Sequence, residues 1–109
     1  MATVLLRTLA HSRTGDKGDT SNISVIAYDR KHYECLREQL SMARVSAFFA
    51  ELLPADAAAP MRYELPNLGA LNFVLPGILK GGVTRSLALD AHGKSLGAAL
   101  LGIEIEVGD

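Results

Sequence analysis

His-Ser-Arg-Thr-Gly-Asp-Lys-Gly-Asp-Thr-Ser-Asn, residues 11–22, is the stretch that decides the fold class. It lies between two apolar segments that are predicted to be strands, Thr3 to Ala10 and Ile23 to Tyr28. No apolar side chain occurs in residues 11–21, so we expect a polar loop there. Strands joined in this way run antiparallel, because a parallel pair needs a long crossover connection, usually a helix. The stretch therefore favours an antiparallel sheet.

Two helical segments are predicted after these strands. Asp29 is expected to cap a short helix, in which apolar residues recur at helical spacing at Tyr33, Leu36 and Leu40. Ser41 is expected to cap a further helix, whose apolar stripe extends to Leu53 before Pro54 ends it. The pattern leaves open whether residues 29–53 form one bent helix or two.

The second half of the chain begins with an alanine-rich surface linker, residues 55–60. Met61 to Leu65 alternates apolar and charged residues, which is typical of a strand with one wet face. The remaining elements are predicted from similar periodicities and turn residues: a helix that Asn67 caps and that reaches Leu79, a strand over 84–90, a turn at 91–94, a short helix that Ser95 caps, and a last strand over 103–107.

The order of these elements predicts an α+β protein. Strands that follow one another directly, with helices gathered between them, indicate a ferredoxin-like α/β sandwich with a mostly antiparallel sheet and helices packed on one face. The alternative is a doubly wound parallel sheet. With 109 residues, the chain is expected to form one domain over residues 1–109 that closes its own core.

Composition excludes several classes of function. Eleven basic and twelve acidic residues give a net charge of −1, and a sequence-independent nucleic-acid binder needs a surplus of Lys and Arg, so no nucleic-acid partner is expected. The most apolar stretch is too short to span a bilayer, and no signal peptide is evident, so we expect a cytoplasmic protein without a membrane segment. Cys35 is the only cysteine and the three histidines lack ligand spacing, so neither a metal nor a cofactor is expected.

The polar stretch is also the first candidate site. Its glycines allow tight turns and close approach to a ligand, while its basic and amide side chains suit an anion, with His11 at its start as a possible general base. It is not a Walker A loop, because Lys17 precedes Gly18 and a strand follows, and a KH-type loop would join two helices. The alternative is a hairpin-like loop rich in turn-forming residues. The candidate residues are His11, Arg13, Gly15, Asp16, Lys17, Gly18 and Asn22.

A second candidate site follows the predicted third helix. Gly81 and Gly82 precede Thr84 and Arg85, so the glycine pair could form a backbone anion nest beside a guanidinium. The alternative is a helix C-cap and a turn. Two asparagines lie nearby in the sequence: Asn67, a helix cap in the simplest interpretation, and Asn72, which lies among apolar residues and is expected to bond a backbone or a ligand.

Three segments together resemble a known family. Residues 13–23 (RTGDKGDTSNI), 63–75 (YELPNLGALNFVL) and 81–94 (GGVTRSLALDAHGK) resemble, in the same order, the C-terminal module of the acyclic terpene utilisation protein A (AtuA) family. The resemblance implies a ferredoxin-like fold and a role in bacterial acyl-CoA or terpenoid breakdown. In that family a larger N-terminal domain precedes the module, and this chain looks like the free-standing version. The family offers no agreed catalytic residue to carry over.

These observations leave several functions open. The first hypothesis is an accessory domain or small subunit that works with a larger AtuA-type protein, with a homo-oligomer also possible because edge strands in so small a protein need covering. The alternative is a stand-alone enzyme or ligand-binding protein for an acyl-CoA or another carboxylate. Arg13, Lys17 and Arg85 would then hold the anionic small molecule, and His11 or Asp16 would move a proton. A third hypothesis is a structural module whose loops only pack.

Overall fold

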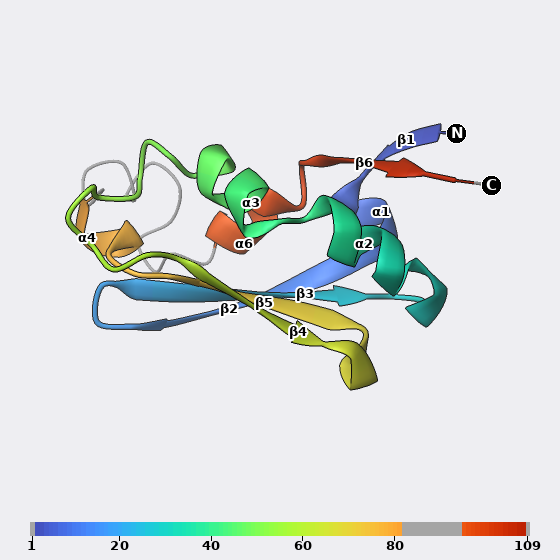
Figure 1. Cartoon of the computed structure of the whole chain (residues 1–109), viewed down its shortest axis with the longest axis horizontal. Coiled ribbons are helices and arrows are strands. Elements are labelled where there is room, and N and C mark those ends of the chain that lie inside the picture. The colour runs from blue at the N-terminus through green and yellow to red at the C-terminus, as the bar shows by residue number, and fades with distance from the viewer. Residues whose placement is uncertain (1, 82–94, 109) are drawn as a thin grey trace.

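A four-stranded antiparallel sheet carries the helices on one of its faces. The structure, a computed structural model, describes residues 2–81 and 95–108. The strand order is β2 (Ala10–Lys17), β3 (Thr20–Ala27), β5 (Ala70–Leu75) and β4 (Met61–Leu65), and every neighbouring pair is antiparallel. Helices α2, α3 and α6 all lie on the same side of this sheet (Figure 1). The predicted fold class, a mostly antiparallel sheet with helices on one face, is confirmed.

A separate two-stranded ribbon joins the ends of the described chain. β1 (Ala2–Leu5) pairs antiparallel with β6 (Glu104–Val107), so the two termini lie side by side (Figure 1). The backbone N–H of Leu6 donates to the carbonyl of Ile103 at 2.8 Å, which extends this contact beyond the strands. The predicted last strand is thus confirmed.

The predicted first strand is wrong in its extent. β1 ends at Leu5, a one-turn helix α1 (Leu6–Leu9) follows, and β2 begins at Ala10. Leu6 and Leu9 are both buried. Residues three apart lie on the same side of a helix but on opposite faces of a strand, so the helical turn allows both leucines to reach the core.

The predicted polar loop is also wrong, because the stretch forms a β-hairpin. β2 and β3 pair from Ala10 with Ala27 to Lys17 with Thr20, and only Gly18 and Asp19 connect them. Gly18 has φ +63°, whereas the non-glycine Asp19 has no positive φ, which is the pattern of a type II′ turn. β2 lies at the edge of the sheet, so backbone pairing with β3 holds it without apolar side chains along its length.

Residues 29–53 form two helices rather than one. After a 3-10 turn, η1 (Arg30–His32), α2 spans Tyr33–Gln39 and α3 spans Met42–Phe48. Both predicted caps are confirmed: the Asp29 carboxylate accepts from the Lys31 N–H at 3.0 Å, and the Ser41 hydroxyl accepts from the Arg44 N–H at 3.1 Å. α3 ends five residues before the predicted Leu53, and the chain continues in turns.

The predicted helix from Asn67 to Leu79 is wrong. Three short elements replace it: a 3-10 turn η2 (Pro66–Leu68), the strand β5, and α4 (Ile78–Gly81). Asn67 therefore lies inside the 3-10 turn and does not cap a helix. The apolar run of β5 is buried at every second residue, Leu71, Phe73 and Leu75. Because the run is short, its apolar positions are also compatible with helical spacing. Pairing with β3 and β4 on its two sides decides in favour of the strand.

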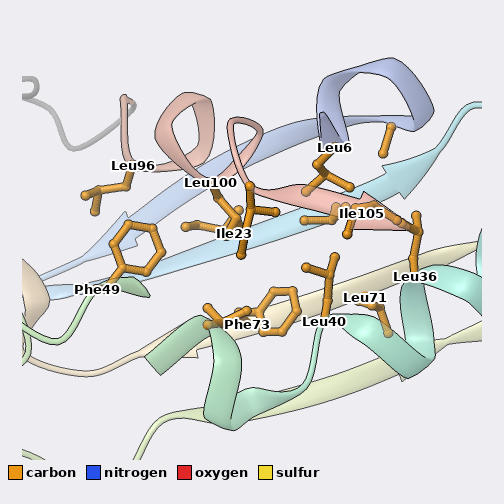
Figure 2. Packing of buried hydrophobic residues seen from close by; sticks show 14 of the residues in the cluster. Leu6, Ile23, Leu36, Leu40, Phe49, Leu71, Phe73, Leu96, Leu100 and Ile105 are labelled. Atoms are coloured by element: carbon orange, nitrogen blue, oxygen red, sulfur yellow. The ribbon is translucent and has the colours of Figure 1, made fainter. Parts of the chain in front are cut away.

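The core lies between the four-stranded sheet and the elements on its covered face. Ile23, Leu71 and Phe73 point from the sheet toward Leu36 and Leu100 of the helices (Figure 2). Helix α6 (Ser95–Leu100) begins at the predicted residue. The strand predicted over 84–90 and the turn at 91–94 lie outside the described residues. No helix in the described part of the chain is both long and apolar enough to cross a membrane.

Candidate functional site on the uncovered sheet face

One face of the four-stranded sheet, here called the open face, points away from the helices. Side chains alternate between the two faces of a strand, and the buried residues Ile23, Val25, Leu71 and Phe73 mark the covered face. The strand register then assigns these residues to the open face: His11, Arg13, Gly15 and Lys17 of β2; Thr20, Asn22, Ser24 and Ile26 of β3; Ala70, Asn72 and Val74 of β5; Met61, Tyr63 and Leu65 of β4.

A polar row crosses the middle of the open face. Arg13 pairs with Ser24, Ser24 with Asn72, and Asn72 with Tyr63, so one residue from each strand stands in line. The Asn72 Nδ2 donates to the Ser24 Oγ at 2.9 Å and to the Asn22 Oδ1 at 3.4 Å. The amide nitrogen of Asn72 thus has two side-chain partners in place of the expected backbone group. Tyr63 and Arg13 stand at the two ends of this row.

In strand β4 the polar and apolar side chains lie on the opposite faces from those expected for a sheet with one face in solvent. Its apolar side chains are on the open face, where Met61, Tyr63 and Leu65 are 51%, 46% and 36% exposed. Its charged side chains, Arg62 and Glu64, are on the covered face instead. β4 alternates as predicted between an apolar face and a charged face. However, the apolar residues lie on the open face and the charged residues lie on the covered face.

Three contacts of the Arg62 guanidinium hold the charged residues of β4 on the covered side. The Arg62 Nη1 donates to the carbonyl oxygens of Arg37 and Leu40 at 2.7 and 3.0 Å, which belong to the C-terminal turn of α2 and the residue that ends it. The Arg62 Nη2 lies 2.9 Å from the Glu64 Oε2. Because carbonyl groups at a helix end lack partners within the helix, Arg62 satisfies them and joins α2 to the edge of the sheet.

Aromatic and apolar side chains extend the open face at one end. Tyr28, which follows β3, is 66% exposed, and its ring stacks with that of His11 with centroids 5.3 Å apart. Exposed apolar side chains that gather on one face are typical of an interaction surface, whereas scattered ones need no explanation. His11 is thus placed beside an aromatic ring.

The charges of the open face have one sign. His11, Arg13 and Lys17 are its ionisable side chains other than tyrosine, and all three can carry only positive charge. The register puts Asp16 opposite Ser21 and Glu64 opposite Leu71, both on the covered face. The described strand residues of the open face thus include no carboxylate, although the chain as a whole has a net charge of −1.

The structure brings some of the predicted site residues together and separates others. His11, Arg13, Gly15, Asn22 and Asn72 share the open face. Lys17 and Gly18 lie at the tip of the β2–β3 hairpin. Asn67 is in η2, between β4 and β5, at the end of the sheet away from that tip (Figure 1).

The second predicted site is only partly described. Gly81 ends α4, which lies near the hairpin tip because the Leu79 N–H donates to the Asp19 carbonyl at 3.0 Å. Gly82, Thr84 and Arg85 lie outside the described residues. The sequence reasoning missed Ser24, Met61 and Tyr63. Their signal was the strict alternation of both strands, which shows that the faces differ but not which of them is covered.

A hollow of about 450 Å³ lies beside the edge strand β2. It is bounded by residues of β2, of α6 and of the turn after α6, namely His11, Ser12, Arg13, Thr14, Ala98 and Leu101. Side chains alternate between the two faces of β2, so the hollow borders the edge strand where the open and covered faces meet. Within residues 2–81 and 95–108, no group of three or more His, Cys, Asp or Glu side chains is placed to hold a metal ion.

Fold and sequence together assign the family. An antiparallel sheet with helices on one face defines an α+β domain. Over residues 4–106 the chain matches the sequence model of the AtuA ferredoxin-like domain, so it belongs to that family. A search of curated proteins gave no significant match, and neither did a search of solved structures.

Proposed function

We propose that this chain is the accessory component of an AtuA-type system and that it associates with a larger AtuA-type protein in the breakdown of acyl-CoA or terpenoid compounds. The observation that carries the proposal is the reversed polarity of β4, whose apolar side chains occupy the face opposite to the described helices. Exposure of such a face to water is unfavourable, so a partner surface that covers it stabilises the assembly. Membership of the AtuA ferredoxin-like family supports the identity of the partner.

Co-purification tests this function. The tagged chain is expressed together with the AtuA-type protein of its own organism, and the eluate is analysed by size-exclusion chromatography with light scattering. We expect a stoichiometric complex. The proposal is wrong if the two proteins elute separately under all salt conditions, and in that case activity should be sought in the isolated chain.

The hollow beside β2 supports a second candidate function, the binding of a carboxylate or an acyl-CoA by the chain alone. His11 and Arg13 are among the residues that border it, and an imidazole and a guanidinium on the same strand suit an anionic ligand. Thermal-shift measurements with acetyl-CoA and with acetate test it. A shift that Arg13→Ala abolishes, in the absence of any partner protein, would favour this function over the accessory role.

A further inference from the structure

The open face has two chemically different halves. On the β4 side lie Met61, Tyr63 and Leu65, whose side chains are apolar and exposed. On the β2 side lie Arg13 and Lys17, both exposed and both positively charged. Between them the linked amides and hydroxyl of Asn22, Ser24 and Asn72 form a polar strip. A surface that covers the whole face must therefore match an apolar half and a cationic half.

Burial of the cationic half requires counter-charges. A guanidinium that loses water without an opposite charge is strongly disfavoured, whereas a bidentate carboxylate partner compensates for the lost hydration. Among the described strand residues none provides this, since the register places Asp16 and Glu64 on the covered face, and Asp19 lies in the turn between β2 and β3. We therefore expect the counter-charges for Arg13 to come from the partner.

A second copy of the chain does not meet this requirement. Any face-to-face dimer would present to Arg13 the same sheet face, whose described strand residues carry no carboxylate, whatever the orientation of the two sheets. Its apolar halves could pack, but the cationic halves would be buried without opposite charges. The charge pattern of the described residues thus favours a different protein over self-association.

We infer that the open face docks a surface of the larger AtuA-type protein that carries apolar side chains opposite β4 and carboxylates opposite Arg13 and Lys17. The inference rests on the proposed function and specifies which face is used and which chemistry it meets. Tyr63 and Arg13 are the expected anchors, because aromatic and arginine side chains dominate the binding energy of protein interfaces. The charged half also makes the affinity dependent on salt.

Matched variants test the inference. Tyr63→Ala and Arg13→Glu alter the two halves of the open face. Phe48→Ala removes an aromatic residue of similar exposure, 43%, from α3 on the helix side, and Lys31→Glu reverses an exposed cation in η1. Binding of each variant to the larger AtuA-type protein is measured by calorimetry at low and high salt. Circular dichroism melts verify that all four variants are folded.

The expected result is a loss of affinity of roughly tenfold or more for Tyr63→Ala and Arg13→Glu, with changes below about threefold for the two control variants. The affinity of Arg13→Glu should also lose most of the salt dependence. If the complex forms but the open-face variants bind normally, the inference is wrong while the proposed function stands. If no complex forms with the wild-type chain, both fail. Self-association that these variants weaken would overturn the choice of a different protein as partner.

Discussion

Arg62 of β4 donates from its Nη1 to the carbonyl oxygen of Leu40, the residue at which α2 ends, at a distance of 3.0 Å. The same nitrogen donates to the carbonyl of Arg37 at 2.7 Å. One guanidinium therefore closes a helix end and attaches the helix to an edge strand. This contact explains how a charged residue comes to lie on the covered face of the sheet.

Replacement of Arg62 should destabilise the fold. In Arg62→Ala, two helix carbonyls lose their donor, and we expect the free energy of unfolding to fall by about 1–3 kcal/mol. Urea denaturation measures the change. Lys31→Ala, at a cation whose side chain is 72% exposed, is the control and should change stability little. An Arg62→Ala variant as stable as wild type would show that water replaces the guanidinium without cost.

Gly97 allows α6 to approach β2. A Cβ atom at Gly97 would overlap the Thr14 Oγ1 and come within 2.9 Å of the Ser12 Oγ. We expect Gly97→Ala to reduce the free energy of unfolding by about 1–3 kcal/mol, although alanine is the better helix former. Thermal and urea denaturation measure the effect.

Two further variants separate the cause of this effect. Gly108→Ala places a methyl group in open space and should be close to neutral. Combination of Gly97→Ala with Thr14→Ala removes the Oγ1 and should recover part of the lost stability. If the double variant is as unstable as the sum of its parts, close packing between these residues is not the reason.

Gly18 is required by the turn of the β2–β3 hairpin. Its φ of +63° is unfavourable for a residue with a Cβ, so Gly18→Ala should lower the free energy of unfolding by roughly 1 kcal/mol or more. Asp19→Ala, at the other turn position, has no such restriction and should cost less. Equilibrium unfolding of both variants decides the matter, and equal effects would contradict the type II′ turn.

Tyr33 buries a hydroxyl that has no hydrogen-bond partner among the described residues. Removal of an unpaired buried hydroxyl relieves its desolvation, so Tyr33→Phe should raise the free energy of unfolding by up to about 1 kcal/mol. Tyr63→Phe, at an exposed tyrosine, is the control and should have no such effect. Chemical denaturation at neutral pH measures both, and a destabilised Tyr33→Phe variant would reveal a hydrogen bond to water.

The same tyrosine should make stability dependent on alkaline pH. Burial, followed by the nearby Glu64 carboxylate, raises the pKa of Tyr33 above its ordinary value of 10.0. The unfolded chain then ionises first, so this contribution to stability is complete below pH 10.0 and decreases as the pH rises through the folded-state pKa. Absorbance titration of the three tyrosines should show one that ionises late, and Tyr33→Phe should lack that step.

Local chemistry predicted the starts of the two helical segments in residues 29–53. The caps at Asp29 and Ser41 depend on a side chain and a backbone N–H close to it in the chain, so both were predicted and both are present. The antiparallel sheet followed from the short connection between the first paired strands. Longer-range pairing was not readable in the same way. β5 is a short apolar run that fits helical and strand spacing alike, and only its neighbours β3 and β4 make it a strand.

Alternation in the sequence is enough to establish that the two faces of β4 differ, because a period of two separates Met61, Tyr63 and Leu65 from Arg62 and Glu64. Which of the two sets faces the helices depends on the tertiary structure. Hydrophobicity alone would place the apolar set in the core. In the folded protein, however, Arg62 faces the helices because it donates hydrogen bonds to the carbonyl groups at the end of α2. A periodicity carries no information about what lies above a strand, since that is set by elements distant in the chain. For this reason the open face, and the binding surface inferred on it, emerged only from the folded protein.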